Sequence, residues 1–229
     1  MRRDPPEPSE PYDREAAILA LRARRAAARG LDPAAYPPLV TPACDRPTRP
    51  LPAARRRLYE GHLRSLLRAL AAGERPPGPE VPPEVTVPPE VDQVLQAGCR
   101  ACRGRCCETG GAHAYQTVDS LRRVRQARPD LSDDGVVSLY LAHLPARAVR
   151  DSCVFHGARG CTLPRDLRGD MCNAFFCEPL LTWRDGARAA GDGAAFVVGY
   201  DDGLLRGGRL FGPPRRARPG EGAGGGGGA

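Results

Sequence analysis

Eight of the nine cysteines in this chain of 229 residues fall within a window of 79 residues, between positions 99 and 177. Cysteine makes up about 10% of that window, a density typical of chains whose cysteines form disulfides or bind metal. Only Cys44 lies outside it. The clustered cysteines are Cys99, Cys102, Cys106, Cys107, Cys153, Cys161, Cys172 and Cys177. Disulfides, buried free thiols, chance clustering and metal ligation are the competing explanations of this density.

The spacing of the eight thiols favours metal ligation over disulfides and over inert buried thiols. Cys99 and Cys102 form a C-x2-C pair, which lets two sulfurs converge on one ion. A disulfide between the adjacent Cys106 and Cys107 would be strained, and we expect a reducing compartment in which disulfides are rare. We therefore predict that the eight are metal ligands, whereas Cys44, among prolines, is a buried free thiol.

The composition indicates a soluble, cytoplasmic protein with no membrane partner. The residues after Met1 are charged and proline-rich, unlike a secretory signal, and no apolar run reaches the roughly 18 residues of a membrane-spanning helix. The net charge is +7, but all 34 basic residues are Arg, and residues 91–211 carry only +2. Nucleic acid is therefore a partner that the charge allows but does not favour. A protein partner and the oligomeric state are left open.

Proline divides the chain into three predicted segments. Eighteen of the 25 prolines lie in residues 1–90, which we predict to be a Pro-rich extension with two helices. Residues 91–211 are the predicted cysteine-cluster metal-binding domain, and residues 212–229 are a disordered Gly-rich tail. The predicted fold class is α+β, a small, mostly helical and irregular cysteine-rich domain with a short C-terminal hairpin.

Hydrophobic periodicity predicts four helices in these segments. They are expected over 12–29, over 53–72, over 118–127 and after Ser132, a plausible N-cap. The second of these turns Tyr59, Leu63, Leu66 and Leu70 to one face. Short strands are expected over 151–155 and 161–163, an extended linker over 75–90, and a hairpin around Asp201-Asp202-Gly203.

Two stretches carry a recognisable cysteine pattern. The first is Cys99-Arg100-Ala101-Cys102 followed by Cys106-Cys107, and the second runs from Cys161-Thr162-Leu163-Pro164 through Arg168-Gly169 to Cys172. They resemble the YkgJ-like cysteine-cluster family, described as a zinc- or iron-chelating domain, whose pattern begins C-x2-C-x2-CC and continues C-x-I-Y-x3-R-P-x2-C-R. The spacing from Cys to Arg to Cys matches over twelve positions, although the first group has one extra residue before its Cys pair. The resemblance covers about residues 97–178 and implies metal chelation by these thiols.

The metal is left open between an iron–sulfur cluster, with 4Fe-4S as one form, and zinc, and the resemblance inclines the prediction to the cluster. Four thiolates hold either kind of centre, so eight cysteines suffice for two, and Cys106, Cys107 or both can be ligands. Arg168 is expected to offset thiolate charge, and Arg105 to favour the thiolate of Cys106 or Cys107. His156 and Glu108 are minor candidate ligands.

The predicted function is that of a cysteine-cluster protein that binds an iron–sulfur cluster or zinc and has a structural, redox or metal-handling role. No nucleotide-binding fingerprint or HExxH motif lies in residues 1–211, so the prediction leans against an enzyme. Two alternatives stay open, a zinc-stabilised nucleic-acid-binding module and a thiol redox or methyltransferase-related enzyme. Steeply salt-dependent binding to DNA or RNA would favour the first of them.

Overall fold

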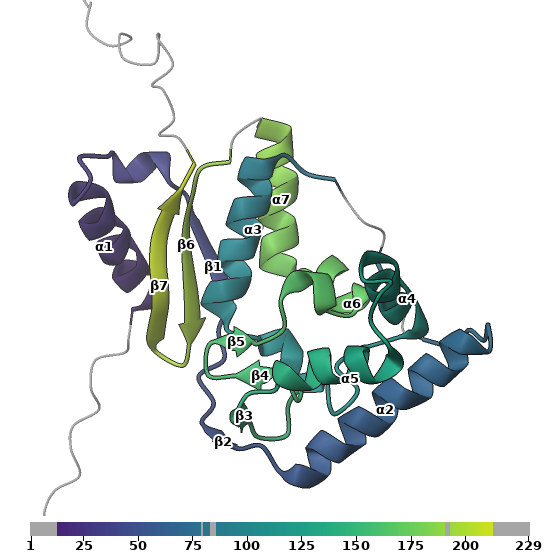
Figure 1. Ribbon diagram of the computed structural model, residues 1–229. Helices are drawn as coiled ribbons and strands as arrows, with labels where there is room; N and C mark the ends of the chain where they lie inside the picture. Colours follow the sequence, from purple (N-terminus) through teal and green to yellow (C-terminus); the bar gives the residue numbers. More distant parts are fainter. Residues whose placement is uncertain (1–12, 79, 83–85, 191–192, 213–229) are drawn as a thin grey trace, which may run out of the picture.

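The computed structural model describes residues 13–78, 80–82, 86–190 and 193–212 (Figure 1). Within these ranges the α-helices are α1 (Arg14–Ala27), α2 (Ala53–Ala71), α3 (Pro89–Cys102), α4 (Val118–Ala127), α5 (Asp133–Ala142), α6 (Asp170–Ala174) and α7 (Glu178–Ala190). The strands are β1 (Pro38–Pro42), β2 (Thr48–Pro50), β3 (Arg147–Val149), β4 (His156–Gly157), β5 (Gly160–Cys161), β6 (Ala195–Asp201) and β7 (Leu204–Phe211). Short 3-10 helices are η1 (Pro33–Ala35), η2 (Arg105–Thr109) and η3 (Arg165–Leu167). None of the described helices is long and apolar enough to cross a membrane.

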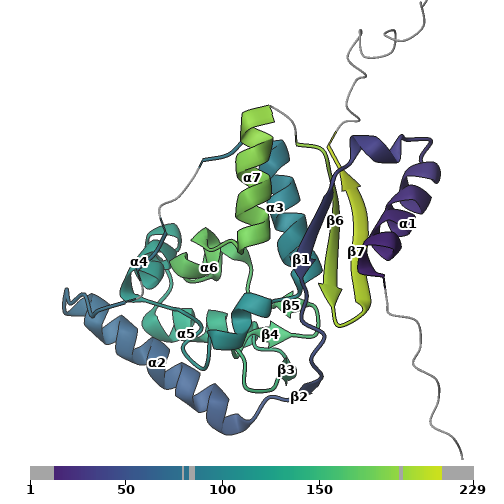
Figure 2. The same ribbon diagram turned by 180° about the vertical axis from the view of Figure 1, so that it is seen from behind.

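Three strands form the main sheet, in the order β1-β6-β7. β1 runs parallel to β6, with Leu39 opposite Val197, and β7 runs antiparallel to β6. Helix α1 covers one face of this sheet, and α3 and α7 cover the other (Figures 1 and 2). We call these six elements the sheet unit.

The central strand explains why both faces are covered. Residues 195–198 of β6 are a continuous apolar run, and all four are buried. Such a run is typical of a strand with helices on both sides. Val197 packs with Leu95 of α3 and Leu180 of α7, whereas the alternate residues Phe196 and Val198 pack towards α1.

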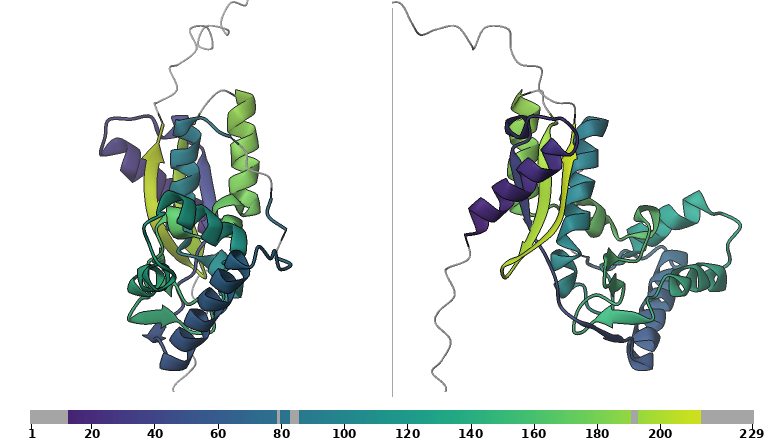
Figure 3. Two further views of the ribbon diagram at one scale, coloured as in Figure 1. Left: turned by 45° about the vertical axis from the view of Figure 1, so that its right-hand side comes forward. Right: turned by 90° about the vertical axis from the view of Figure 1, so that its left-hand side faces the viewer.

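The remaining elements form a second unit, which we call the helical unit, built on α2, α4 and α5 (Figure 3). The apolar face predicted for α2 is confirmed, because Tyr59, Leu63 and Leu66 are buried. The ring of Tyr59 makes edge contacts with Tyr140 and Phe155, with centroids 6.4 and 5.0 Å apart. These aromatic residues lie in a hydrophobic core that is separate from the two cores of the sheet unit.

The α+β class is confirmed, and so are several local predictions. Helix α4 covers 118–127, and the Ser132 side chain caps α5 by accepting from the Gly135 N–H at 3.1 Å. The hairpin turns at Asp202 and Gly203, both with positive φ. Residues 12 and 213–229, the latter nearly all of the predicted tail, lie outside the described residues.

Other predictions need correction. Residues 151–155 are not a strand, and β4 begins only at His156. The Ser152 hydroxyl and the backbone N–H groups of Cys153 and Val154 donate instead to carbonyl oxygens of other loops. The sequence did not predict α3, α7 or β1. β1 belongs to the segment expected as a Pro-rich extension, yet it pairs along β6. Residues from both sides of the predicted boundary at 90 therefore share one sheet.

Helix α3 lies very close to β6, and this contact depends on Gly199. A Cβ added there would stand 2.5 Å from the Ala101 carbonyl oxygen. We predict that Gly199→Ala lowers the free energy of unfolding by about 1–3 kcal/mol, because backbone must move to admit the methyl group. Urea denaturation of the purified protein measures the change.

Gly61, in the middle of α2, is the matched control for Gly199→Ala. Nothing lies within 4 Å of a Cβ added at Gly61, and the residue is exposed. Gly61→Ala is expected to raise the free energy of unfolding by roughly 0.5–1 kcal/mol, because alanine loses less conformational freedom in a helix. A Gly199→Ala protein as stable as the wild type would contradict the close contact between α3 and β6.

Candidate metal centre

The first four clustered cysteines lie at the end of α3 and just beyond it. Cys99 and Cys102 stand three residues apart in the last turn of the helix, so they share one face. Arg103 then adopts a left-handed conformation, with φ of 55°, and the chain turns into η2, which carries Cys106 and Cys107. A non-glycine residue with positive φ stores strain, and such residues concentrate at functional sites.

The other four cysteines come from the second half of the chain. The backbone N–H of Cys153, just before β4, donates to the Cys107 carbonyl at 2.9 Å. Cys161 ends β5, Cys172 lies in α6, and Cys177 directly precedes α7. All nine cysteines of the chain are free thiols.

The mutual electrostatic effects of the thiols divide them into two groups. Burial raises the pKa of Cys99, and the charges of Cys106, Cys102 and Cys177 raise it further, to about 12. Burial likewise raises the pKa of Cys172 to about 12, together with the charges of Cys153, Cys161 and Cys106. We call Cys99, Cys102 and Cys177 the Cys99 group. We call Cys107, Cys153, Cys161 and Cys172 the Cys107 group.

Cys106 stands between the two groups. Burial is the largest cause that raises the pKa of six other thiols, and the negative charge of Cys106 raises it further in each of them. With the seventh, Cys107, it shares a hydrogen bond between side chains. The structure thus brings all eight predicted site residues into one neighbourhood, and Cys106 interacts with every other member.

Each group packs on a different core. Cys107, Cys153 and Cys161 contact the core of the helical unit. Cys99 and Cys177 contact the core between the sheet and α3 and α7. The thiols therefore lie along the junction of the two units.

Cys106 differs from its neighbours in exposure and in charge. It is the only exposed thiol of the nine. The hydrogen bond from the Cys107 thiol and the positive charge of Arg168 lower the pKa of Cys106 to about 7, although burial of its surroundings opposes them. The same hydrogen bond raises the pKa of Cys107 far above its usual range. At neutral pH, Cys106 is the thiol of this pair that carries the charge.

The positive charge of Arg168 acts on the thiols, as the sequence suggested. Besides its effect on Cys106, it hydrogen-bonds Cys161 and lowers the pKa of that thiol, against the larger effect of burial. Arg105, by contrast, was expected to favour a neighbouring thiolate. Its Nη1 donates to Glu108 at 3.3 Å, so its charge is paired.

A residue that the sequence did not single out holds this loop in place. Arg123 of α4 donates to the carbonyl oxygens of Asp166 and Arg168, each at 2.6 Å, and to the Asp170 carboxylate at 3.0 Å. It thereby fixes both Arg168 and the start of α6, which carries Cys172. No local pattern identifies such a residue, because its partners lie more than 40 positions away.

His156 and Glu108 do not serve as ligands in this arrangement. His156 is buried, its Nε2 donates to the Arg103 carbonyl at 2.7 Å, and its Nδ1 lies 2.6 Å from the Ser152 hydroxyl. Both ring nitrogens are therefore engaged with protein atoms. Glu108 pairs with Arg105.

Cys44 lies beside the site but apart from the two groups. It is buried, as predicted, and its backbone N–H donates to the Cys102 carbonyl at 2.8 Å. Burial raises the pKa of its thiol, and the Glu108 carboxylate raises it further. Cys44 thus helps to hold the end of α3, and its side chain interacts with Glu108.

No group of three or more His, Cys, Asp or Glu side chains among the described residues is arranged to hold a single metal ion. The eight thiols share one neighbourhood without closing around one point. Comparison of the chain with family models, curated proteins and solved structures finds no match. Metal ligation and the likeness to the YkgJ-like family therefore stay predictions.

The charge of Cys106 can be tested in the metal-free protein. Because its pKa is about 7, the rate of its alkylation by iodoacetamide should rise between pH 6 and pH 8 and level off above. Arg168→Gln should shift this rise to higher pH, because the thiolate loses a positive neighbour. Mass spectrometry of the labelled peptide follows Cys106 alone.

Two further variants control this measurement. Arg168→Lys keeps the charge and should keep most of the wild-type pH profile. Arg105→Gln should leave the profile unchanged, because Arg105 is paired with Glu108. A larger shift with Arg105→Gln than with Arg168→Gln would refute our assignment.

Proposed function

We propose that the chain binds two metal centres through two sets of four thiolates, and that each centre is an iron–sulfur cluster. The first set is Cys99, Cys102, Cys106 and Cys177. The second set is Cys107, Cys153, Cys161 and Cys172. The observation that carries this proposal is the division of the thiols into two electrostatic groups, with Cys106 completing the group of three.

The chemistry of the donors fits such centres. Four thiolates are the usual ligand set of an iron–sulfur cluster, and each proposed set has four. The adjacent Cys106 and Cys107 fall into different sets, so η2 would carry one ligand of each centre. Charge compensation comes from Arg168, whose guanidinium acts on thiols of both sets.

Zinc and iron–sulfur clusters need different spacings of their four thiolates. A tetrahedral zinc site has Zn–S bonds of about 2.3 Å, which bring its sulfurs to within about 4 Å of one another. An iron–sulfur cluster has its inorganic core between the thiolates and so needs them farther apart. We favour clusters because of the resemblance to the YkgJ-like family, and the metal and sulfide content of the purified protein decides between the two.

The proposed role is redox, with a structural contribution. When bound, an iron–sulfur cluster accepts and releases single electrons. Cys106 is exposed, so the first centre would lie near the surface, within reach of a protein partner. Because the two sets contact two different cores, ligation would also join the helical unit to the sheet unit.

Anaerobic purification tests the identity of the metal. The protein should contain iron and acid-labile sulfide in equal amounts and show a broad visible band near ~400 nm, which thiolate-bound clusters produce. Iron, sulfide and zinc are measured on the same sample. Colourless protein with zinc and no sulfide would overturn the cluster assignment.

Serine variants test the division into two sets. Cys102→Ser and Cys172→Ser each remove one ligand, from different sets, so each should lose about half of the bound iron. Cys44→Ser is the matched control and should lose none. Circular dichroism confirms that each variant is folded. Loss of all the iron from a folded single variant would show one shared centre and refute the two sets.

A further inference from the structure

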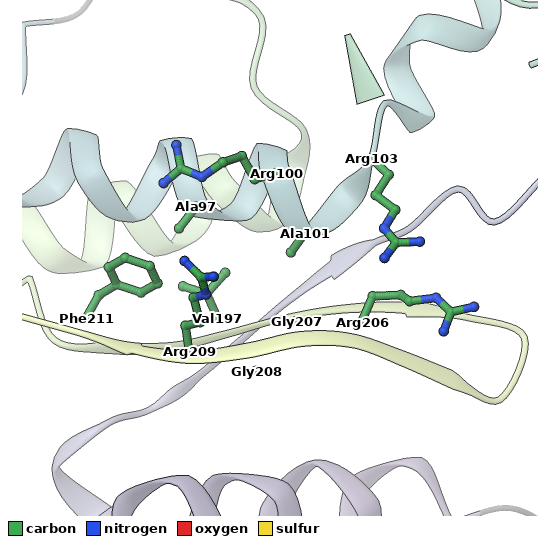
Figure 4. A pocket seen from close by; sticks show the side chains of 10 residues that line it. All are labelled: Ala97, Arg100, Ala101, Arg103, Val197, Arg206, Gly207, Gly208, Arg209 and Phe211. Atoms are coloured by element: carbon green, nitrogen blue, oxygen red, sulfur yellow. The ribbon is translucent and has the colours of Figure 1, made fainter. Parts of the chain in front are cut away.

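A pocket lies between the end of α3 and β7, on the side of the helix that faces the sheet (Figure 4). Its volume is about 200 Å³. The lining residues are Ala97, Arg100, Ala101, Arg103, Val197, Arg206, Gly207, Gly208, Arg209 and Phe211. Four of them are arginines, and none is a carboxylate. No cysteine lines this pocket.

A β-bulge creates the basic wall of the pocket. In a regular strand, residues three positions apart point to opposite faces. Here the register shifts at β7, so Arg209 lies opposite Val197 and Arg206 lies opposite Gly199, on the face of β6 that α3 covers. Gly207 and Gly208 allow the shift with φ of 83° and 88°. The bulge thus places two arginines on one face, where a regular strand would place one.

The helix supplies the other two arginines. Figure 4 shows Arg100 and Arg103 at the α3 side of the pocket and Arg206 and Arg209 at the β7 side. Arg103 and Arg206 share the carboxylate of Asp45. Arg100 and Arg209 are exposed, and their side chains form no hydrogen bond or ion pair with the described residues. Four guanidinium groups with one neighbouring carboxylate leave an excess of three positive charges.

One donor in the pocket wall lacks a partner. The Nε of Arg206 is buried, and no hydrogen-bond acceptor for it lies within the described part of the chain. A buried donor without an acceptor costs free energy, so it needs an explanation. An anion in the pocket would supply the acceptor once the Arg206 side chain turns towards it.

We propose that this pocket binds a small anion of the phosphate class, an inorganic phosphate or the diphosphate group of a small molecule. Guanidinium groups match phosphate oxygens in geometry and charge. Pockets for drug-sized ligands measure about 300–1,000 Å³, so this one fits a phosphorylated group and excludes a large ligand. Val197 and Phe211 give the pocket an apolar wall. The assignment is independent of the proposed metal centres.

Calorimetric titration of the full-length protein with inorganic pyrophosphate and with inorganic phosphate tests the proposal. We expect at least one of them to bind with a Kd below about 1 mM at ~0.15 M salt. The double variant Arg100→Gln/Arg209→Gln should weaken binding at least about tenfold, because it removes two charged donors that have no other partner. Iron is measured before and after titration, so that extraction of metal by pyrophosphate is not counted as binding.

The control is the double variant Arg56→Gln/Arg57→Gln. It removes the same charge from the exposed surface of α2 and should bind like the wild type. Equal weakening in both double variants would show general electrostatic attraction and overturn the pocket. Absence of binding by both anions would overturn it too, as would binding of a single-stranded oligonucleotide alone. Unchanged iron content in the pocket variant separates this test from that of the metal centres.

Discussion

The close contact of α3 with β6 positions everything that we assign to function. At the end of the helix, the Ala101 carbonyl stands where a side chain at residue 199 would be. With the helix fixed in this way, Ala97, Arg100 and Ala101 line the pocket against β7. Cys99 and Cys102 take part instead in the cluster of thiols. The end of α3 therefore carries Arg100 beside the pocket and the thiols of Cys99 and Cys102 in the cysteine cluster.

The thiols lie along the junction of the two units, next to the core of each. Only 5% of the residues are aromatic, and the apolar side chains are divided among three separate cores. The chain passes between the two units at four places, from β1 to β2, from α2 to α3, from α3 to η2 and from α6 to α7, and cysteines of the cluster lie at the last two. Metal ligation couples directly to folding when the ligands come from different elements. Ligation here would act on the junction between the two units.

Local signals in the sequence predicted the local structure well. The period of the apolar residues located α2 and α4, and Ser132 located the start of α5. Long-range partners were not predictable in the same way, because β1 pairs with a strand more than 150 residues later. α3 was missed because Gly98 and the C-x2-C spacing suggest a ligand loop. The glycine is required instead by packing, since a Cβ there would lie 2.4 Å from a Leu180 methyl group. The gathering of the eight thiols was predictable from cysteine spacing, but their division into two groups depends on tertiary structure.

The arginines show why the charge of +7 is a poor guide to partners. Many of them donate to backbone carbonyl oxygens of the chain itself. The irregular loops leave these oxygens without a partner in a helix or a sheet. Arg168 donates to the Leu163 carbonyl at 2.9 Å, Arg147 to that of Thr48 at 2.8 Å, and Arg46 to that of Arg150 at 2.9 Å. Arginines with such internal roles have fewer free donors for a nucleic-acid backbone. Arg100 and Arg209 lack partners among the described residues, and they face one small pocket. Charge concentrated in this way suits a compact anion better than a polymer.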